Sequence, residues 1–439
     1  MTPAYGSNYT SVAAASRIGD SGLARRLRRE LEGEVLFDAF SRGRYSTDAS
    51  IYQIEPVGVV VPRHQQDILT AIQIAADEGI PVLPRGGGTS QIGQTVGTAL
   101  VIDNTKFYNQ IGEFDAESRS VWVEPGLVLD QLNRWLNPQG LFYPVDVSTG
   151  NRATLGGMAG NNSCGARSIR YGNMVHNVQA IEALLADGSR ACFADLQQAI
   201  TECHQPELVH KLRDLGQREA EEIAQRFPDL LRRVGGYNID ELVSADSGNL
   251  ARLLVGSEGT LAYFTRLKLA LSPIPQHKVL GVCHFPTFHA AMDATQHIVK
   301  LDPCAVELVD RTMIELSRDI PMFRATVDRF VQGEPDALLL VEFAGEDLNQ
   351  QTTQLAKLVE LMADLGFPEA VVEVTDPEFQ SAVWEVRKAG LNIMMSMKGD
   401  GKPVSFVEDC AVPLQDLAVA FGHAGLGRFH DLDQVTMFP

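Results

Sequence analysis

The chain has 439 residues, of which 45% are hydrophobic, so it can bury more than one core and is neither a disordered nor a fibrous protein. Its 37 basic and 56 acidic residues give a formal net charge of -19, which argues against nucleic acid or an anionic membrane surface as the main partner. A small-molecule substrate fits better, and an anionic cofactor would have to be held by local backbone N–H groups and a few arginines.

The cysteines and the N-terminus indicate the cellular compartment. No CxxC pair or clustered spacing suitable for zinc or an iron-sulfur centre occurs among the six cysteines, Cys164, Cys192, Cys203, Cys283, Cys304 and Cys410. The N-terminus lacks a signal-peptide core, and no run of 18 apolar residues is present. We therefore expect a cytoplasmic protein with reduced thiols and no transmembrane segment, and peripheral contact with the inner membrane remains open.

The first predicted elements lead into a glycine-rich loop. Residues 1–50 form a polar, arginine-rich arm with a helix around Gly22 to Gly33. A buried strand follows at Val57 to Val61, and apolar residues spaced as on one helix face come next. A second short strand starts at Pro81 and runs into the segment PRGGGTSQIGQ, which begins at Pro84. The pattern predicts a strand-helix-strand unit that ends in this loop.

Residues 111–272 predict a second α+β unit. It contains a strand at Ser120 to Glu124, a helix after Leu127, and later strands around Ala183 and Leu253. A charged helical stretch from Glu202 to Arg233 is inserted in it. Pro273 and Pro275 mark its end.

Strands and helices alternate beyond that boundary, which predicts a separate α/β sandwich. The strands are expected at Val279 to Phe285, Cys304 to Val309, Ala337 to Phe343 and Ala370 to Val374, with helices at Phe288 to Lys300, between the second and third strands, and at Leu348 to Leu365. Asp376 and Pro377 then form an N-cap and first-turn pair for a helix that carries Trp384 and Arg387.

The loop from Pro84 to Gln94 is the strongest chemical feature. Three consecutive glycines after a strand let backbone N–H groups approach a pyrophosphate, and Thr89 and Ser90 add hydroxyl donors. A dinucleotide fold of the GxGxxG type is excluded because Gln91 stands where the last glycine is needed, and no GxxxxGK[ST] occurs. A tight surface turn is the competing interpretation.

Two further polar glycine clusters favour a ligand-binding role. The first runs from Pro144 to Gly172 and contains TLGGMAGNNSCG, whose amides and hydroxyls can serve an isoalloxazine edge and ribityl hydroxyls. The second is GSEGTL, from Gly256 to Leu261. Three such clusters in one domain indicate a long, extended ligand.

The order of PRGGGTSQIG, TLGGMAGNNSCG with RYGNMVHNV, RVGGYNIDEL and GSEGTL resembles the FAD-binding domain of the vanillyl-alcohol oxidase / p-cresol methylhydroxylase (PCMH-type) superfamily. The likeness covers roughly residues 50–413, and within the superfamily it is to bacterial D-2-hydroxy-acid (D-lactate or D-2-hydroxyglutarate) dehydrogenases fused to an iron-sulfur part. It implies an α+β fold: a two-part FAD domain over 51–272, after the arm of 1–50, then an incomplete α/β-sandwich (ferredoxin-like) substrate domain over 273–420 and an atypical tail over 421–439.

The resemblance also implies a cofactor site. It places FAD against a set of residues from all three clusters: Arg85, Gly86, Gly87, Gly88, Thr89, Ser90, Gly93, Pro144, Asp146, Gly156, Gly157, Asn161, Asn162, Ser163, Gly165, Glu258 and Gly259. Relatives with covalent flavin often carry a histidine at the position of Thr89, so noncovalent FAD is expected here. The alternative for any one of these residues is that it only shapes its loop.

The implied reaction is hydride transfer from C2 of a D-2-hydroxy acid to flavin N5. In WEVRKAG the resemblance assigns Arg387 to the substrate carboxylate, a role suited to a guanidinium fork, although a surface ion pair is the alternative. It places Glu408 and Asp409 near the substrate as well. Those two acids precede a helix, so they can instead complement its dipole.

His423 and His430 have the spacing of the superfamily's metal-binding GHxGDGNxH motif, so a divalent metal that polarises the substrate hydroxyl is one hypothesis. Leu426 and Arg428 depart from the motif, and the chain ends at Pro439 before the segment that carries the third ligand and the base in relatives. We therefore expect a C-terminally truncated or altered chain.

Three functions remain open from the sequence. The first is an FAD-dependent D-2-hydroxy-acid dehydrogenase that passes electrons to a separate iron-sulfur partner, a quinone or oxygen. The second is an FAD-binding but catalytically incomplete fragment. The third is an FAD oxidase of sugars or aldonolactones, against which Arg387 speaks because a neutral alcohol needs no carboxylate clamp.

Overall fold

The computed structural model describes residues 14–195, 205–230, 233, 235–243, 248–395, 397 and 411–423. Glu408, Asp409 and His430 lie outside this range, as does the side chain of His423. The described residues belong to two compact units. The first unit comprises Met1–Cys164, Asn173–Pro228 and Val234–Pro273, and the second Gly165–Gly172, Asp229–Arg233 and Ile274–Pro439.

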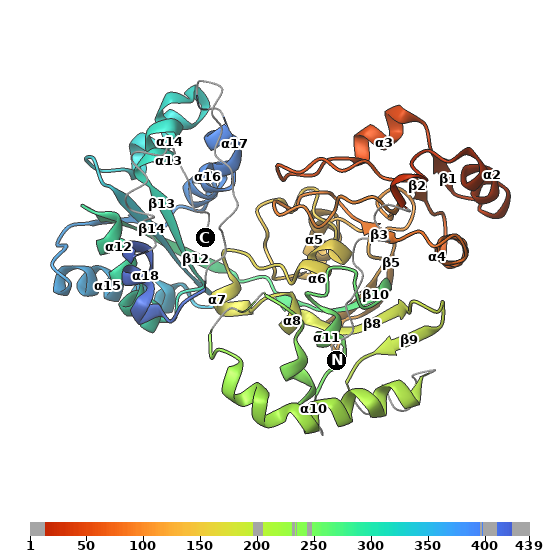
Figure 1. Cartoon of the computed structure of the whole chain (residues 1–439). Coiled ribbons are helices and arrows are strands. Elements are labelled where there is room, and N and C mark those ends of the chain that lie inside the picture. Colours follow the sequence, from red (N-terminus) through yellow and green to blue (C-terminus); the bar gives the residue numbers. More distant parts are fainter. Residues whose placement is uncertain are drawn as a thin grey trace. The chain divides into compact units, whose positions relative to one another are not determined.

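The first unit begins with a small four-stranded sheet in the order β1-β2-β4-β3 (Figure 1). Strands β2 and β3 are parallel to β4, whereas β1 pairs antiparallel with β2. The elements of this subdomain are α2 (Ser21–Glu30), β1 (Glu34–Leu36), α3 (Ala39–Tyr45), β2 (Gly58–Val61), α4 (Gln65–Asp77), β3 (Val82–Arg85) and β4 (Leu100–Asp103). The strand-helix-strand unit predicted before the glycine loop corresponds to β2, α4 and β3.

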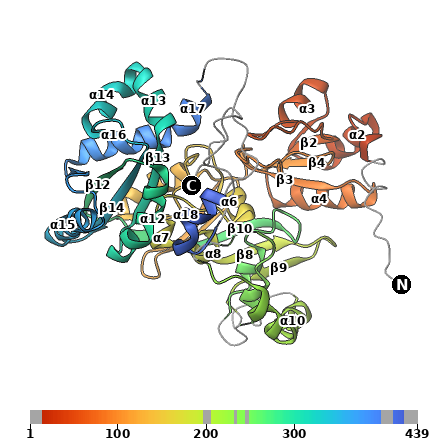
Figure 2. The ribbon, with the colours of Figure 1, turned by 60° about the vertical axis from the view of Figure 1, so that its left-hand side comes forward.

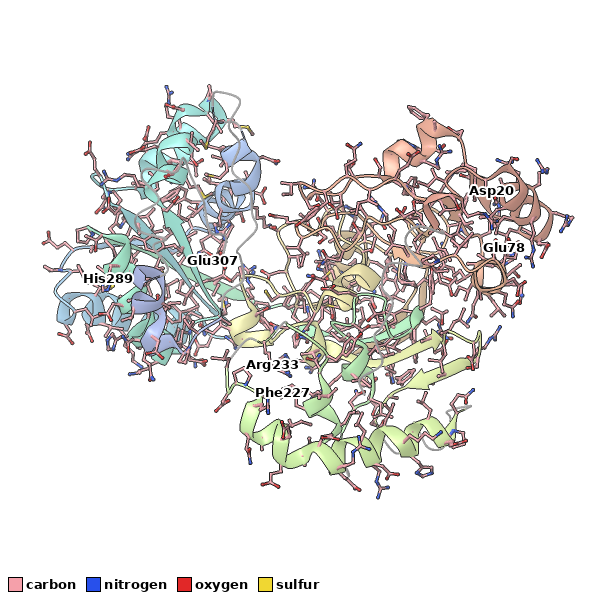
Figure 3. The ribbon with its side chains drawn as sticks, viewed as in Figure 1. Asp20, Glu78, Phe227, Arg233, His289 and Glu307 are labelled. Carbon is pink, nitrogen blue, oxygen red and sulfur yellow. The ribbon has the colours of Figure 1, made fainter. Side chains whose placement is uncertain are left out.

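The arginine-rich arm is part of this subdomain over its described residues. Leu23 and Leu27 of α2 are buried in the same core as Ile68 of α4 and Leu100 of β4. The Arg17 side chain donates to Asp20 Oδ2 at 2.6 Å and to Glu78 Oε2 at 2.9 Å, so it links the start of α2 to the end of α4 (Figure 3). The arm thereby adds α2 and β1 to the fold instead of extending from it.

The rest of the first unit is built on a five-stranded antiparallel sheet in the order β5-β6-β10-β8-β9. Its strands are β5 (Ile111–Asp115), β6 (Ser120–Val123), β8 (Val178–Leu184), β9 (Arg190–Phe193) and β10 (Tyr263–Ala270). Its other elements are α5 (Leu129–Leu136), η1 (Asn137–Gln139), α6 (Leu155–Asn161), α8 (Met174–Asn177), α10 (Pro206–Arg226), η2 (Ile239–Leu242) and α11 (Ala251–Leu254), and a short ribbon pairs β7 (Leu141–Phe142) with β11 (Ser272–Pro273).

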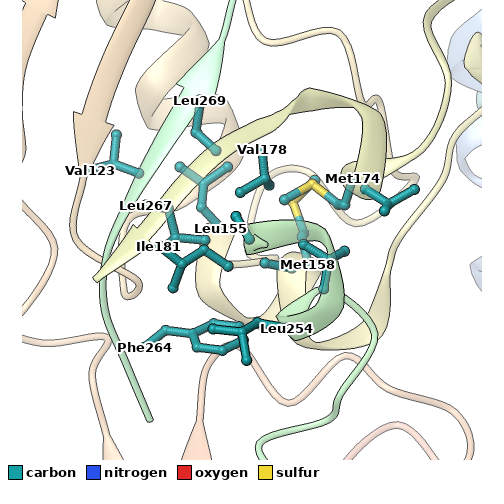
Figure 4. Packing of buried hydrophobic residues seen from close by; sticks show 14 of the residues in the cluster. Val123, Leu155, Met158, Met174, Val178, Ile181, Leu254, Phe264, Leu267 and Leu269 are labelled. Carbon is teal, nitrogen blue, oxygen red and sulfur yellow. The ribbon is translucent and has the colours of Figure 1, made fainter. Parts of the chain in front are cut away.

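Helix α6 packs on this sheet. Figure 4 shows Leu155 and Met158 of α6 beside Val178 and Ile181 of β8 and Leu267 of β10, and all five side chains are buried. The strand predicted around Leu253 was wrong. That residue lies in the short helix α11, and a run of buried apolar residues alone does not separate a strand from a buried helical turn.

The second unit has a four-stranded antiparallel sheet in the order β13-β14-β12-β15. Its strands are β12 (His277–Phe285), β13 (Ala305–Asp310), β14 (Ala337–Gly345) and β15 (Val371–Val374). Numbered from one along the chain, the order is 2-3-1-4, that of a ferredoxin-like fold. The expected sandwich is therefore present.

Helices cover both faces of that sheet (Figure 2). One face packs against α13 (Arg311–Asp319), α14 (Pro321–Phe330), α16 (Pro377–Lys388) and α17 (Gly390–Met395), and the other against α12 (Phe288–Ile298), α15 (Leu348–Asp364) and α18 (Leu417–His423), with η3 (Val299–Leu301), η4 (Leu414–Asp416) and α7 (Ser168–Tyr171) as short additions. The single helix predicted between β13 and β14 is a pair, divided where Pro321 starts α14.

The predicted cap of α16 is present, because Asp376 accepts a hydrogen bond from the Phe379 N–H at 2.8 Å. None of the described helices is long and apolar enough to cross a membrane.

Candidate functional site

The glycine loop after β3 contains successive backbone N–H groups that have no hydrogen-bond acceptor among the described residues. Among the described residues, none accepts a hydrogen bond from the backbone N–H groups of Gly86 through Gln91. Backbone donors normally find a partner, so six successive N–H groups without one form a ready site for an anion. The structure places this loop at the end of a strand, as the sequence predicted.

The loop lies directly against the second glycine cluster. A Cβ added to Gly86 would come within 2.0 Å of Thr154 Oγ1, and one added to Gly87 within 2.3 Å of the Arg152 carbonyl oxygen. These approaches are too close for any side chain, so glycine is required at both positions. Thr154 is the N-cap of α6 and accepts from the Gly157 N–H at 3.4 Å, which places the start of α6 beside the loop.

The third glycine cluster, Gly256 to Leu261, contacts the same helix. The N–H groups of Gly256 and Glu258 donate to the carbonyl oxygens of Ala159 and Gly160, each at 2.9 Å. Gly259 approaches the Pro84 ring so closely that an added Cβ would lie 3.2 Å from its Cγ. Three segments far apart in the sequence therefore meet around α6 and the start of the glycine loop.

Arg85 holds the loop in place. Its guanidinium donates to the carbonyl oxygens of Tyr45 at 3.0 Å, Thr47 at 2.7 Å and Thr95 at 3.1 Å, and the side chain is buried. Burial lowers the pKa of Arg85, and the nearby carboxylates of Asp48 and Asp103 oppose that shift. These contacts make Arg85 a residue that positions the loop and supplies a positive charge behind it.

The two asparagines at the end of α6 differ in exposure and in their hydrogen-bond partners. Asn161 is exposed, accepts from Gln94 Nε2 at 3.1 Å and donates to Ser163 Oγ at 3.1 Å, so it ties the end of α6 to the glycine loop. Asn162 is buried with a left-handed φ of 52°, and its Oδ1 accepts from the Val175 N–H at 3.0 Å. Asn162 therefore shapes the turn after α6.

Four more of the predicted cofactor residues, Pro144, Asp146, Gly156 and Gly165, lie in the second glycine cluster. Pro144 is buried and Asp146 half-buried in the loop that follows β7, and Gly156 donates its N–H to the Pro125 carbonyl at 2.8 Å. Gly165 belongs to the second unit, and its N–H donates to Ser168 Oγ at 2.9 Å. The residues Gly165–Gly172 thus depart from the continuous span expected for the FAD domain.

Arg387 is not a surface arginine. It lies on α16, and its Nη2 is 2.6 Å from Glu307 Oε2 of β13, with only 12% and 11% of the two side chains exposed. Figure 3 labels Glu307. Burial raises the pKa of the neighbouring Asp310, and the Arg387 charge opposes the rise. Arg387 is therefore a buried cation that already holds one carboxylate.

A second buried ion pair was missed by the sequence analysis. Arg167 donates from Nε and Nη2 to the two carboxylate oxygens of Glu342 at 2.8 and 2.9 Å, a bidentate pair. Cys304 Sγ also contacts Glu342 Oε1 at 3.2 Å. Glu342 lies on β14 two residues beyond Leu340, which is the register partner of Glu307, so both acids lie on the α16 face of the sheet. Glu342 is the one acid in the otherwise apolar strand β14, which indicates a buried position, but the sequence does not identify its partner.

A metal site finds no support within the described residues, where no group of three or more His, Cys, Asp or Glu side chains could hold an ion. The ligands suggested by the sequence, His423 and His430, fall outside the described side chains. The metal hypothesis thus remains a prediction.

The first unit has what an extended dinucleotide requires: donors for a diphosphate, a glycine cradle that a Cβ would fill, and a polar helix end beside it. These features are those of a binding domain for a diphosphate-containing dinucleotide, and a ferredoxin-like unit follows it in the chain. Residues 56–191 match the model of the FAD binding domain, and residues 274–430 match that of the C-terminal domain of FAD linked oxidases. The chain therefore carries an FAD binding domain of the PCMH type and a C-terminal domain of the FAD linked oxidases, and FAD is its cofactor.

Curated relatives are consistent with this assignment. The chain is 31% identical to a D-2-hydroxyglutarate dehydrogenase of Haemophilus influenzae, over 93% of this chain and 44% of the relative. It is 27% identical to the mitochondrial D-lactate dehydrogenase [cytochrome] of Arabidopsis thaliana, over 85% of this chain and 59% of the relative. The chain thus spans less than two thirds of the length of these relatives.

A solved structure with the same fold is that of alkyldihydroxyacetonephosphate synthase. It superposes with a TM-score of 0.62 at 17% sequence identity, over 85% of this chain and 63% of the synthase. At that identity the likeness concerns the fold alone.

Proposed function

We propose that this chain is the FAD-carrying part of a D-2-hydroxy-acid dehydrogenase, with D-lactate or D-2-hydroxyglutarate as the substrate class. FAD, when bound, accepts the hydride that leaves C2 of the acid. The observation that carries the proposal is the run of six N–H groups from Gly86 to Gln91 beside the start of α6. The dehydrogenases of this class among its relatives support the choice of substrate.

The cofactor site is proposed to work through the backbone. The N–H groups of the loop donate to the diphosphate oxygens, and the Arg85 charge behind the loop favours that anion. Thr89 offers no imidazole for a covalent link, so the flavin is held noncovalently. Asn161 and Gln94, which hydrogen-bond one another, are proposed to contact the cofactor beyond the diphosphate.

Substrate binding is proposed to depend on Arg387. Its guanidinium has five N–H donors, so the contact with Glu307 leaves donors for a substrate carboxylate. Glu408, Asp409, His423 and His430 stay candidates for the chemistry at the substrate hydroxyl. Electrons are proposed to pass to a separate acceptor, which is an iron-sulfur partner, a quinone or oxygen.

The test is anaerobic mixing of the purified, FAD-loaded chain with the two enantiomers of lactate and of 2-hydroxyglutarate, followed by flavin absorbance near 450 nm. The proposal predicts bleaching by a D-acid and none by its L-enantiomer, which has the same charge and size. A flavin that stays oxidised with all four acids contradicts it, and favours an FAD-binding chain that does not turn over. Bleaching by a sugar or aldonolactone instead favours the oxidase alternative.

A further inference from the structure

Helix α16 carries two buried donors that have no acceptor among the described residues, Trp384 Nε1 and Arg387 Nε. Only 7% of Trp384 is exposed. Residues three apart lie on the same side of a helix, so both donors come from the face of α16 that packs on the sheet. Native proteins rarely leave buried donors unpaired, and two together on one face point to a ligand that brings acceptor oxygens.

The charges around these donors limit what that ligand is. The Arg167 guanidinium lies 5.2 Å from the centre of the Trp384 ring and pairs with Glu342, while Arg387 pairs with Glu307. Asp310 also lies close enough to Arg387 to interact with its charge. The two unpaired groups are both N–H donors, so they would hydrogen-bond acceptor oxygens such as those of a carboxylate, which could share the Arg387 charge with Glu307.

We propose that Trp384 Nε1–H and Arg387 Nε–H together donate hydrogen bonds to the carboxylate of the acid substrate. Glu307 is then a positioning residue: its ion pair with Arg387 orients the guanidinium so that the Nε–H points away from Glu307 and toward the substrate. The identification of the ligand as a 2-hydroxy acid rests on the proposed function. The indole N–H makes Trp384 a specificity-determining residue for the carboxylate, distinct from its packing role.

The test measures binding without turnover. The probe is 2-hydroxyisobutyrate, which has the carboxylate and the hydroxyl of a 2-hydroxy acid but no hydrogen on C2 and therefore cannot be oxidised there. Ligand-observed NMR gives its Kd for the FAD-loaded wild type and for Trp384→Phe, which keeps an aromatic side chain, removes the N–H and is smaller than the indole. The matched control is Trp122→Phe, because the Trp122 ring also lies near an arginine, 4.7 Å from Arg266, in the other unit.

Loss of a hydrogen bond to a charged group is expected to raise the Kd of Trp384→Phe at least 10-fold. Phenylalanine is smaller than the buried indole, so the melting temperature of the variant is expected to fall modestly, and its Kd is measured well below that temperature. Trp122→Phe should bind the probe like the wild type. An unchanged Kd in Trp384→Phe, or an equal rise in the control, overturns the proposal.

Glu307→Gln tests the positioning role, since it keeps the shape of the side chain and removes its charge. With the Arg387 charge no longer shared, the probe should bind about 10-fold more tightly, while kcat for a D-acid should fall because the fork is less firmly oriented. Weaker binding contradicts this role. If no acid reduces the flavin and tight binding of the probe still requires Trp384, the carboxylate site stands and the proposed function fails. If a D-acid reduces the flavin and binding of the probe does not depend on Trp384, the proposed function stands and the carboxylate site fails.

Discussion

Substitution of Gly87 by alanine should separate FAD binding from folding. The added Cβ would lie 2.3 Å from the Arg152 carbonyl oxygen, about 1 Å inside an ordinary contact, and the obstacle is backbone that no side-chain rotation can relieve. The loop must therefore move away from the start of α6. Its N–H groups would move with it, away from the positions that the diphosphate requires.

The size of the effect follows from the bonds at risk. A hydrogen bond to a charged group contributes about 1.5–3 kcal/mol, so weakening one or two of the six loop donors should cost FAD binding about 3 kcal/mol, or roughly 100-fold in Kd. The strain itself is local, because Gly87 is exposed and outside the core clusters. Thermal stability of the apoprotein should therefore change little.

The assay is the quenching of FAD fluorescence on titration with apoprotein. Gly43→Ala is the control: it lies in α3, an added Cβ meets nothing within 4 Å, and alanine in a helix should stabilise the protein slightly. A Gly87→Ala protein that is folded and binds FAD as tightly as the wild type would refute the placement of the diphosphate.

Three further predictions concern buried charges and thiols. Arg85→Lys should weaken FAD binding about 10-fold in the same fluorescence titration, because an ammonium cannot reach the three carbonyls that the guanidinium serves; retention of full affinity would argue against its positioning role. Burial raises the pKa of Glu342, but the Arg167 charge and hydrogen bond outweigh it and hold the pKa below the ordinary glutamate value. The stabilisation from this pair is thus complete above about pH 4.3, the pKa of glutamate in the unfolded chain, and is lost as the pH falls through the lower pKa of the folded state. Arg167→Gln should lower the free energy of unfolding, measured in urea at pH 7, by about 3–5 kcal/mol and reduce its dependence on pH in the acid range. An unaltered pH profile would contradict the pairing. Burial also raises the pKa values of the Cys283 and Cys304 thiols, so both should resist Ellman's reagent at pH 8 until the chain is unfolded, and rapid native labelling, read by mass spectrometry, would contradict their burial.

The glycine loop could be predicted because its chemistry is local. Three adjacent glycines after a strand allow a closer approach of the backbone to other segments than any other residue does, and the sequence displays them directly. The same holds for the Asp376 cap and for the alternation of strands and helices in the second unit. The relation of the three clusters to α6 came only with tertiary structure, because Gly256 and Pro84 are far apart in the chain.

Buried charge could not be predicted from the pattern. Glu342 stands in the apolar run of β14 and Glu307 in β13, but nothing in the sequence says that α16 covers them or that Arg167 and Arg387 pair with them. Arg85 was expected to supply charge to the cofactor, yet most of its donors hold neighbouring carbonyls. The two acids lie dozens of residues from the arginines that pair with them, and the fold decides which charges meet.

The central claim is that the N–H groups of Gly86 to Gln91 bind the diphosphate of FAD. The most direct measurement compares the affinities of the apoprotein for FAD and for riboflavin, which shares the ring system and lacks the diphosphate and the adenosine. The account predicts FAD binding with one-to-one stoichiometry and riboflavin binding at least 100-fold weaker. Equal affinity for the two flavins, or no binding of FAD by the folded chain, would contradict it.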